Sequence, residues 1–268
     1  MIWRTGLTAL ASAGIFTSVA TACPAPVEAS EIELFPSGAM LPENLLRVYI
    51  YFPRRMGTNF DSSDIMLTDA SGDEVTDVFL PMRFELWSPD RQRLTLLLDP
   101  GRVKTGLVAH DALGRALVSG ETYTLTIPDD LADSDGCGLG NTVSFSFAVA
   151  APDREPPSPG DWQFEPPAAA SKSALRIDLG SPHDHLSMAY RIRVITADGE
   201  AVPGEIAIIE DESVWEFVPR QVWAPSEYRI VIDPRLEDLA GNRPGVPFDR
   251  PAEGPTKSAV SELIFVPH

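Results

Sequence analysis

The chain has 268 residues, 44% of them hydrophobic, and a formal net charge of −18 at pH 7. This length is typical of two ordinary domains, because one domain usually contains roughly 100–150 residues. A charge of this sign repels phosphate backbones and anionic lipid headgroups, so it disfavours nucleic-acid binding and membrane attachment through a basic patch. The 25 prolines and 19 glycines are spread along the whole chain, which disfavours long helices and favours an all-β fold.

Residues 1–22 have the features of an export signal. Arg4 gives a short positive start, residues 6–20 form an apolar run with small residues, and residues 20–22 (Ala-Thr-Ala) fit the small-x-small pattern that signal peptidases accept. No later segment approaches the length of a membrane span. We therefore expect an exported protein with a signal peptide at 1–22, followed by a short Pro/Ala tether at 23–30.

Cys23 follows this cleavage site directly, and the sequence leaves two fates open for it. Residues 20–23 (Ala-Thr-Ala-Cys) resemble part of a bacterial lipoprotein box, in which the cysteine thiol is acylated and anchors the protein to a membrane. The match is partial, because that family prefers an aliphatic residue in place of Ala20. Lipidation of Cys23 would leave Cys137 unpaired, whereas an unmodified Cys23 could form a disulfide with Cys137 in an oxidising compartment. Soluble secretion, with cleavage after Ala22 or Ala29, is the alternative to an anchor.

Residues 31–150 show the pattern of a first β-domain. In residues 47–52 the side chains of Val48, Ile50 and Phe52 share one face of a strand. The turn at 69–73 contains Gly72, which can take the positive φ of a hairpin turn. Further strands are expected at 65–68, 84–87, 94–98, 122–127 and 143–147. The glycine-containing segment 100–119 is expected to be an inserted loop, a common location for functional residues.

Residues 151–160 contain four prolines and are expected to form an extended, fairly stiff linker. A second β-domain follows at 161–268. Its strands are expected at 175–179, 192–195, 205–209, 214–218, 228–232 and 262–266.

The two domains repeat each other. Residues 70–75 match residues 197–202, the pair Leu94/Leu96 matches Trp215/Phe217, and residues 120–127 match residues 225–232. Order, turn residues and strand period all agree. We therefore expect a duplicated β-domain.

Several motifs resemble bacterial Ig-like domains of the kind found in S-layer and other exported surface proteins. They are residues 53–56 after a strand, the Ala-x-Gly-x-x-Val turn, strand 227–232 and, most specifically, the Leu-Glu-Asp-Leu-Ala-Gly-Asn turn at 236–242. The first domain has only an outline of that last turn, at 131–133 and 140–141. The resemblance implies two tandem Ig-like β-sandwich domains used as a spacer, stalk or adhesion module, and this family has no catalytic residues to transfer.

Two groups of side chains are candidate metal ligands. His183 and His185 flank Asp184, and on a strand both imidazoles would point to the same side. However, the alignment with residues 53–56 places them in a turn, and no third ligand is in register. Asp129, Asp133 and Asp135 could offer oxygen ligands to calcium, but their segment lacks the complete twelve-residue loop pattern. We expect no metal and no cofactor.

Trp87, Trp162, Trp215 and Trp223 could form a sugar-stacking platform, yet Trp215 matches Leu94 in the repeat, which favours a core position. No catalytic elbow, phosphate loop or dinucleotide fingerprint occurs. We interpret the chain as a non-enzymatic cell-envelope protein, a structural, adhesion or interaction module. Its partner would be a protein or a cell-surface glycan, and it would be lipid-anchored, periplasmic or extracellular. The alternative is a metal- or carbohydrate-binding protein, or a metal-dependent enzyme, using the 100–119 insert and the His183-Asp184-His185 turn.

Overall fold

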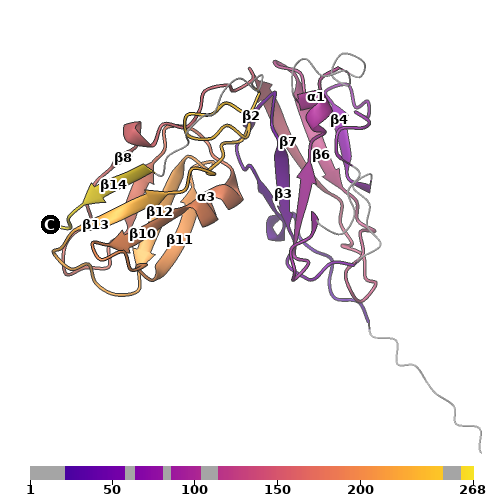
Figure 1. Cartoon of the computed structure of the whole chain (residues 1–268). Helices are drawn as coiled ribbons and strands as arrows, with labels where there is room; N and C mark the ends of the chain where they lie inside the picture. The colour runs from indigo at the N-terminus through magenta and orange to yellow at the C-terminus, as the bar shows by residue number, and fades with distance from the viewer. Residues whose placement is uncertain (1–21, 58–63, 81–85, 104–113, 250–260) are drawn as a thin grey trace, which may run out of the picture.

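A computed structural model describes residues 22–57, 64–80, 86–103, 114–249 and 261–268. These residues form two Ig-like β-sandwiches in series, joined by the proline-rich linker and inclined to each other (Figure 1). The predicted all-β fold is confirmed. The predicted signal peptide lies outside the described residues, except for its last residue. No helix in the described part of the chain is long and apolar enough to cross a membrane.

The first sandwich packs a three-stranded sheet, in the order β1-β3-β5, against a four-stranded sheet, in the order β2-β7-β6-β4. Pairing is antiparallel except between β2 and β7, which run parallel. Its elements are η1 (Ala29–Glu31), β1 (Glu33–Phe35), β2 (Met40–Pro42), β3 (Arg47–Tyr51), β4 (Met66–Asp69), β5 (Arg93–Leu97), α1 (Pro100–Val103), β6 (Thr122–Ile127) and β7 (Val143–Ala150).

The second sandwich packs a four-stranded sheet, in the order β11-β12-β9-β8, against a three-stranded sheet, in the order β10-β13-β14. Its elements are η4 (Pro159–Asp161), β8 (Gln163–Phe164), β9 (Leu175–Asp178), α3 (His185–Arg191), β10 (Ile192–Thr196), β11 (Gly204–Ile209), β12 (Val214–Pro219), β13 (Tyr228–Ile232) and β14 (Ser261–Phe265). Each sandwich has its own hydrophobic core.

The strand registers contain the repeat that the sequence predicts. Leu94 pairs with Ile50 on the central strand β3, and Trp215 pairs with Ile177 on the central strand β9. All four side chains are at most 1% exposed. The next inward pairs, Leu96 with Val48 and Phe217 with Leu175, correspond in the same way. The two sandwiches therefore fill their cores from the same positions.

A tyrosine fixes the start of the same strand in both sandwiches. The hydroxyl of Tyr123 on β6 accepts the backbone N–H of Val118 at 3.1 Å, and the hydroxyl of Tyr228 on β13 accepts the N–H of Ala224 at 3.1 Å. Each ring also stacks on a phenylalanine of the neighbouring strand. This arrangement is similar to the tyrosine corner of Ig-type sandwiches, in which a buried tyrosine ties the strand to the chain before it.

Four five-residue turns share one construction. They are residues 69–73, 133–137, 196–200 and 238–242. In each turn a side-chain oxygen of the first residue accepts a hydrogen bond from the N–H of the fifth residue. This bond compensates for the backbone hydrogen bonds that a tight turn lacks. The fourth residue is a glycine with φ between +77° and +87°, a conformation that side chains disfavour.

Two predicted segments differ from the structure, and a third lies partly outside the described residues. The predicted loop at 100–119 begins with the short helix α1, and residues 104–113 lie outside the described residues. Arg102 belongs to α1, and its buried guanidinium donates to the backbone carbonyls of Thr76, Asp77, Gly114 and Arg115.

The predicted turn at 183–185 leads directly into helix α3, because the Asp184 side chain caps the free N–H of Ser187. Of the predicted strand 84–87, residues 84 and 85 lie outside the described residues, and Trp87 forms an isolated bridge with Leu94.

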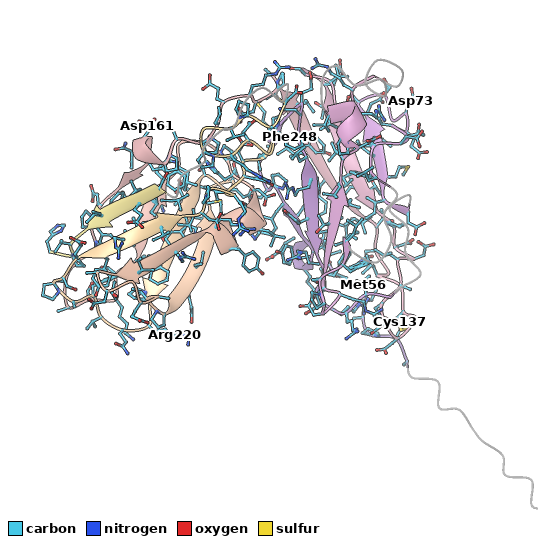
Figure 2. The ribbon with its side chains drawn as sticks, viewed as in Figure 1. Met56, Asp73, Cys137, Asp161, Arg220 and Phe248 are labelled. Atoms are coloured by element: carbon cyan, nitrogen blue, oxygen red, sulfur yellow. A yellow bond between two sulfur atoms is a disulfide. The ribbon has the colours of Figure 1, made fainter. Side chains whose placement is uncertain are left out.

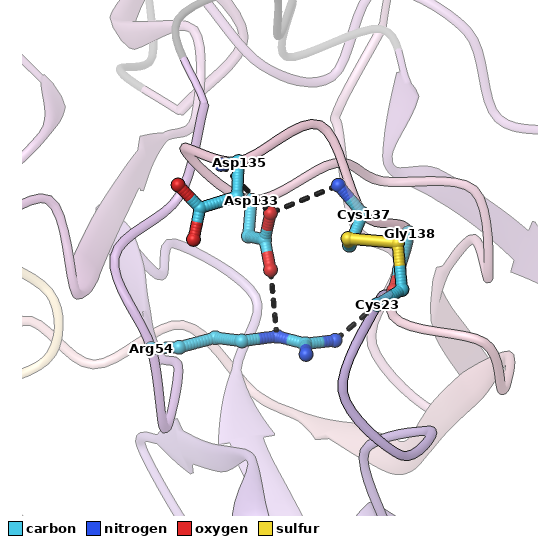
Figure 3. The surroundings of a disulfide bond; sticks show 6 residues. All are labelled: Cys23, Arg54, Asp133, Asp135, Cys137 and Gly138. Carbon is cyan, nitrogen blue, oxygen red and sulfur yellow. Dashed lines mark hydrogen bonds and ion pairs between the residues drawn. A yellow bond between two sulfur atoms is a disulfide. The ribbon is translucent and has the colours of Figure 1, made fainter. Parts of the chain in front are cut away.

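The structure contains the disulfide between Cys23 and Cys137, one of the two fates left open for Cys23 (Figure 3). A thioether to lipid would use the same sulfur atom, so this bond and lipidation of Cys23 exclude each other. The start of the predicted tether lies against the first sandwich. Val27 is 4% exposed, and its N–H donates to the Leu139 carbonyl at 2.7 Å.

We expect that replacing either Tyr123 or Tyr228 with phenylalanine lowers the free energy of unfolding by about 1–2 kcal/mol, because each change leaves a backbone N–H without its acceptor. Urea unfolding measures the effect. Tyr190→Phe is the matched control, because Tyr190 is 74% exposed. An equal loss in the control, or no loss in the two corner variants, would contradict the assigned role.

Candidate functional site: the junction between the sandwiches

The turn at 238–242 belongs to the second sandwich by sequence but packs into the first. Leu239 is 6% exposed and forms part of the first hydrophobic core. Its carbonyl accepts the N–H of Leu46 at 3.0 Å. Gly241 has a φ of +77°, which side chains disfavour, and a Cβ there would lie 2.2 Å from Cδ1 of Leu46, so a larger residue would strain the backbone and displace Leu46. The Leu-Ala-Gly-Asn motif is thus the docking element between the sandwiches, with Phe248 close by at the junction (Figure 2).

A partly buried ion-pair network lies beside this turn. Arg47 on β3 pairs with Glu237 and lies 3.5 Å from Asp184 through its Nε. The hydroxyl of Tyr49 donates to Oδ2 of Asp184 at 2.8 Å, while Oδ1 of Asp184 accepts the N–H of Ser187 at the start of α3. The capping residue of α3 is therefore also the acceptor for the first sandwich. Removing the partner of a buried charge such as Asp184 typically costs about 3–5 kcal/mol.

The protonation states of this network follow from burial and charge. Burial raises the pKa of Asp184, and the neighbouring Arg47 opposes that shift. Burial disfavours the charge of Arg47, but Asp184, Tyr49 and Glu237 raise its pKa above its usual value, so it stays positive. Burial and the Asp184 carboxylate both raise the pKa of Tyr49, which therefore remains a hydrogen-bond donor.

A second set of contacts connects the segment before β2 to the second sandwich. Glu212, which is 2% exposed, accepts from the N–H of Ser37 at 2.9 Å and from its hydroxyl at 2.8 Å. Burial raises the pKa of this carboxyl group. The ring of His185 stacks on Phe35, with the ring centroids 3.7 Å apart. The junction is thus formed by several elements of each sandwich.

The linker is also held at the junction. Asn44 and Asp153 exchange two hydrogen bonds, of 2.6 and 2.8 Å, and the side-chain amide of Asn242 reaches the Asp153 carbonyl at 3.4 Å. Burial raises the pKa of the nearby Asp238 to about 7, and the Asp153 charge adds to the shift. This part of the linker is fixed to both sandwiches.

The two histidines proposed as metal ligands lie in separate environments. His183 is fully buried and bridges to Asp238, the same relation that Met56 has to Asp133 in the first sandwich. Its Nδ1 lies 2.8 Å from the Ser181 carbonyl. His185 is in helix α3, so the strand geometry that would align the two imidazoles is absent.

Of the three acidic candidates, Asp133 is used by its own turn. Oδ1 of Asp133 accepts the N–H groups of Asp135 and Cys137, and Oδ2 faces Nε of Arg54 at 3.3 Å (Figure 3). Asp129 and Asp135 are exposed. Within the described residues, no group of three or more His, Cys, Asp or Glu side chains is arranged to hold a metal ion.

The tryptophans do not form an exposed platform. Trp162, Trp215 and Trp223 are buried in the second core, and Trp87 packs against the first. The residues that do meet at the junction, Arg47 and Tyr49, were missed by the sequence reasoning. Their signal is their alternation with Val48 and Ile50, which places two large side chains on the outer face of a strand.

No protein-family model matches the chain, and no curated protein matches it. Among solved structures, the N-terminal Ig1-2 module of the Drosophila receptor protein tyrosine phosphatase DLAR is 12% identical, with 75% of this chain and 90% of that chain covered and a TM-score of 0.24. Murine CEACAM1b is 10% identical, with the same two shares covered and a TM-score of 0.18. Similarity at this level does not bear on function.

We expect His183 to make stability depend on pH. Burial lowers its pKa from 6.5 to about 4, so between these values the unfolded chain binds a proton that the folded chain excludes. The contribution of neutral His183 is therefore present above the unfolded pKa and is lost as the pH falls towards about 4.

His183→Met removes this dependence, and Met56 shows that methionine suits the equivalent position. Relative to this variant, the wild type should lose on the order of 2–3 kcal/mol of unfolding free energy between about pH 7 and about pH 4.5. Urea unfolding at the two pH values measures the difference, in which the contributions of the other groups cancel. Parallel pH dependences of the two proteins would contradict the expectation.

Proposed function

We propose that the chain is an exported, non-enzymatic tandem Ig-like module that acts as a rigid spacer or interaction unit of the cell envelope. The observation that supports this role most directly is the position of Leu239, a residue of the second sandwich that is buried in the core of the first. Its partner would be a protein or a cell-surface glycan.

The contacts at the junction support a fixed angle between the sandwiches. Sandwiches joined only by a linker are expected to move relative to each other. Here Asp153 of the linker is hydrogen-bonded to Asn44, and the charges of Arg47, Asp184 and Glu237 are paired at partly buried positions. Opening the junction would expose Leu239 and separate these pairs, so the closed arrangement is favoured.

Export is supported by the signal-like residues 1–22 and by the disulfide, because disulfides persist in oxidising compartments. Lipidation of Cys23 is the competing possibility, since acylation of its sulfur excludes the disulfide.

Intact-mass analysis of the protein from its native host separates these two fates. We expect a chain cleaved near residue 22 and lacking the two hydrogens of the thiol pair, with a mass that increases by those hydrogens on reduction. A mass increase equal to attached acyl chains, together with a free thiol on Cys137, would establish the lipoprotein instead. An intact chain with residues 1–22 still present would contradict export through this signal.

Small-angle X-ray scattering tests the rigid spacer. We expect the wild type to scatter as one fixed arrangement, and Leu239→Asp to increase the radius of gyration and give the profile of two mobile bodies, because a buried carboxylate opposes docking. Ile264→Asp is the matched control, since Ile264 is 61% exposed in the same sandwich. Scattering from a flexible pair in the wild type would contradict the proposed function.

A further inference from the structure

A hollow of about 400 Å³ lies beside helix α3 at the junction, within the size range of small-molecule sites. Positively charged side chains predominate in its lining, although the chain as a whole has a net charge of −18. The lining residues used below are Arg47, Arg191, Arg235, Arg243, Tyr190 and Leu186.

Two of the four arginines are neutralised by the junction itself. Arg47 pairs with Asp184 and Glu237, and Nε of Arg243 donates to Glu237 at 2.9 Å. Two positive and two negative charges thus cancel. These two arginines connect the hollow to the contacts that hold the sandwiches together.

The other two arginines share one carboxylate. Arg235 makes two hydrogen bonds with Asp233, of 3.0 and 2.8 Å, and Arg191 reaches the same carboxylate at 3.4 Å. Hydrogen bonds from Arg235 hold the pKa of Asp233 well below its usual range, so Asp233 stays ionised. One positive charge is left over, and neither guanidinium pairs across the junction in the described part of the chain.

The hollow also has a rigid floor and an open rim. Tyr49 and Asp184 line it and are each 3% exposed, so the floor is fixed by the junction. The side chains of Arg235 and Arg243 are 63% and 47% exposed, so a ligand can reach them. Tyr190 is 74% exposed at the edge of the hollow and offers an aromatic face.

We propose that this hollow binds the carboxylate of an acidic sugar. The carboxylate accepts charge-assisted hydrogen bonds from Arg191 and Arg235, whose planar guanidinium groups suit a carboxylate. The sugar ring packs on Tyr190. A hydroxyl-bearing ring matches the site better than an apolar body, because Leu186 is the one aliphatic side chain among the lining residues and the others carry polar groups. This site is additional to the spacer role and does not depend on it.

Isothermal titration with D-glucuronate, D-glucose and acetate tests the proposal, since glucose lacks the carboxylate and acetate lacks the ring. We expect saturable binding of glucuronate, and binding at least tenfold weaker for each of the other two. The double variant Arg191→Gln plus Arg235→Gln should weaken glucuronate binding at least tenfold, and Tyr190→Ala should weaken it several-fold.

Arg220→Gln is the charge-matched control, because Arg220 is exposed at the far end of the second sandwich, and its binding should equal that of the wild type (Figure 2). Unchanged melting temperatures show that the exposed substitutions leave the fold intact. The proposal is overturned if glucuronate does not bind saturably, if glucose or acetate binds as tightly, or if the double variant binds like the wild type.

Discussion

The packing of Leu239 into the neighbouring core is the interaction on which the rest of the arrangement depends. Once this side chain is buried, Asp184 is held away from water and Glu237 is partly covered against the first sandwich, and both are stabilised by a positive or donating partner. Arg47 and Tyr49 provide those partners from the outer face of β3. The apolar contact and the polar network therefore support each other, because neither carboxylate is well placed without the docked turn.

The two sandwiches use the same parts for different purposes. In each sandwich one five-residue turn that begins with an aspartate, 133–137 or 238–242, holds a neighbouring segment through its fifth residue. In the first copy that residue is Cys137, which bonds to Cys23 and holds the N-terminal segment. In the second it is Asn242, which reaches the linker at Asp153 and the N–H of Phe248. The two sandwiches thus contain equivalent turns, and each turn holds a segment that lies next to it.

How much of the structure could be predicted from the sequence depends on how far apart in the chain the interacting residues lie. Strands and turns depend on alternation and on residues such as Gly72 and Gly199, so the repeat and the sandwich fold were predictable. Helix α3 has a local signal, the capping residue Asp184, but its seven residues are too few for a clear apolar period. The junction has only a weak local signal, the alternation of Arg47 and Tyr49 with the buried Val48 and Ile50. Arg47 and Tyr49 occupy positions that would face solvent in an isolated sandwich, and it is the contacts with Asp184 and Glu237 that bury Tyr49 and partly cover Arg47. His183 is ambiguous in sequence because the same residue type serves as a metal ligand and as a neutral core side chain.

Hydrogen exchange measured by mass spectrometry on Leu239→Ala tests the shared core most directly, with Leu236→Ala as its control, because Leu236 is fully buried in the second core. We predict that Leu239→Ala accelerates exchange in peptides of the first sandwich around Leu46, whose N–H donates to the residue at 239. Leu236→Ala should accelerate exchange in the second sandwich alone. Unchanged exchange around Leu46 in the Leu239→Ala protein would contradict the claim that the second sandwich completes the core of the first.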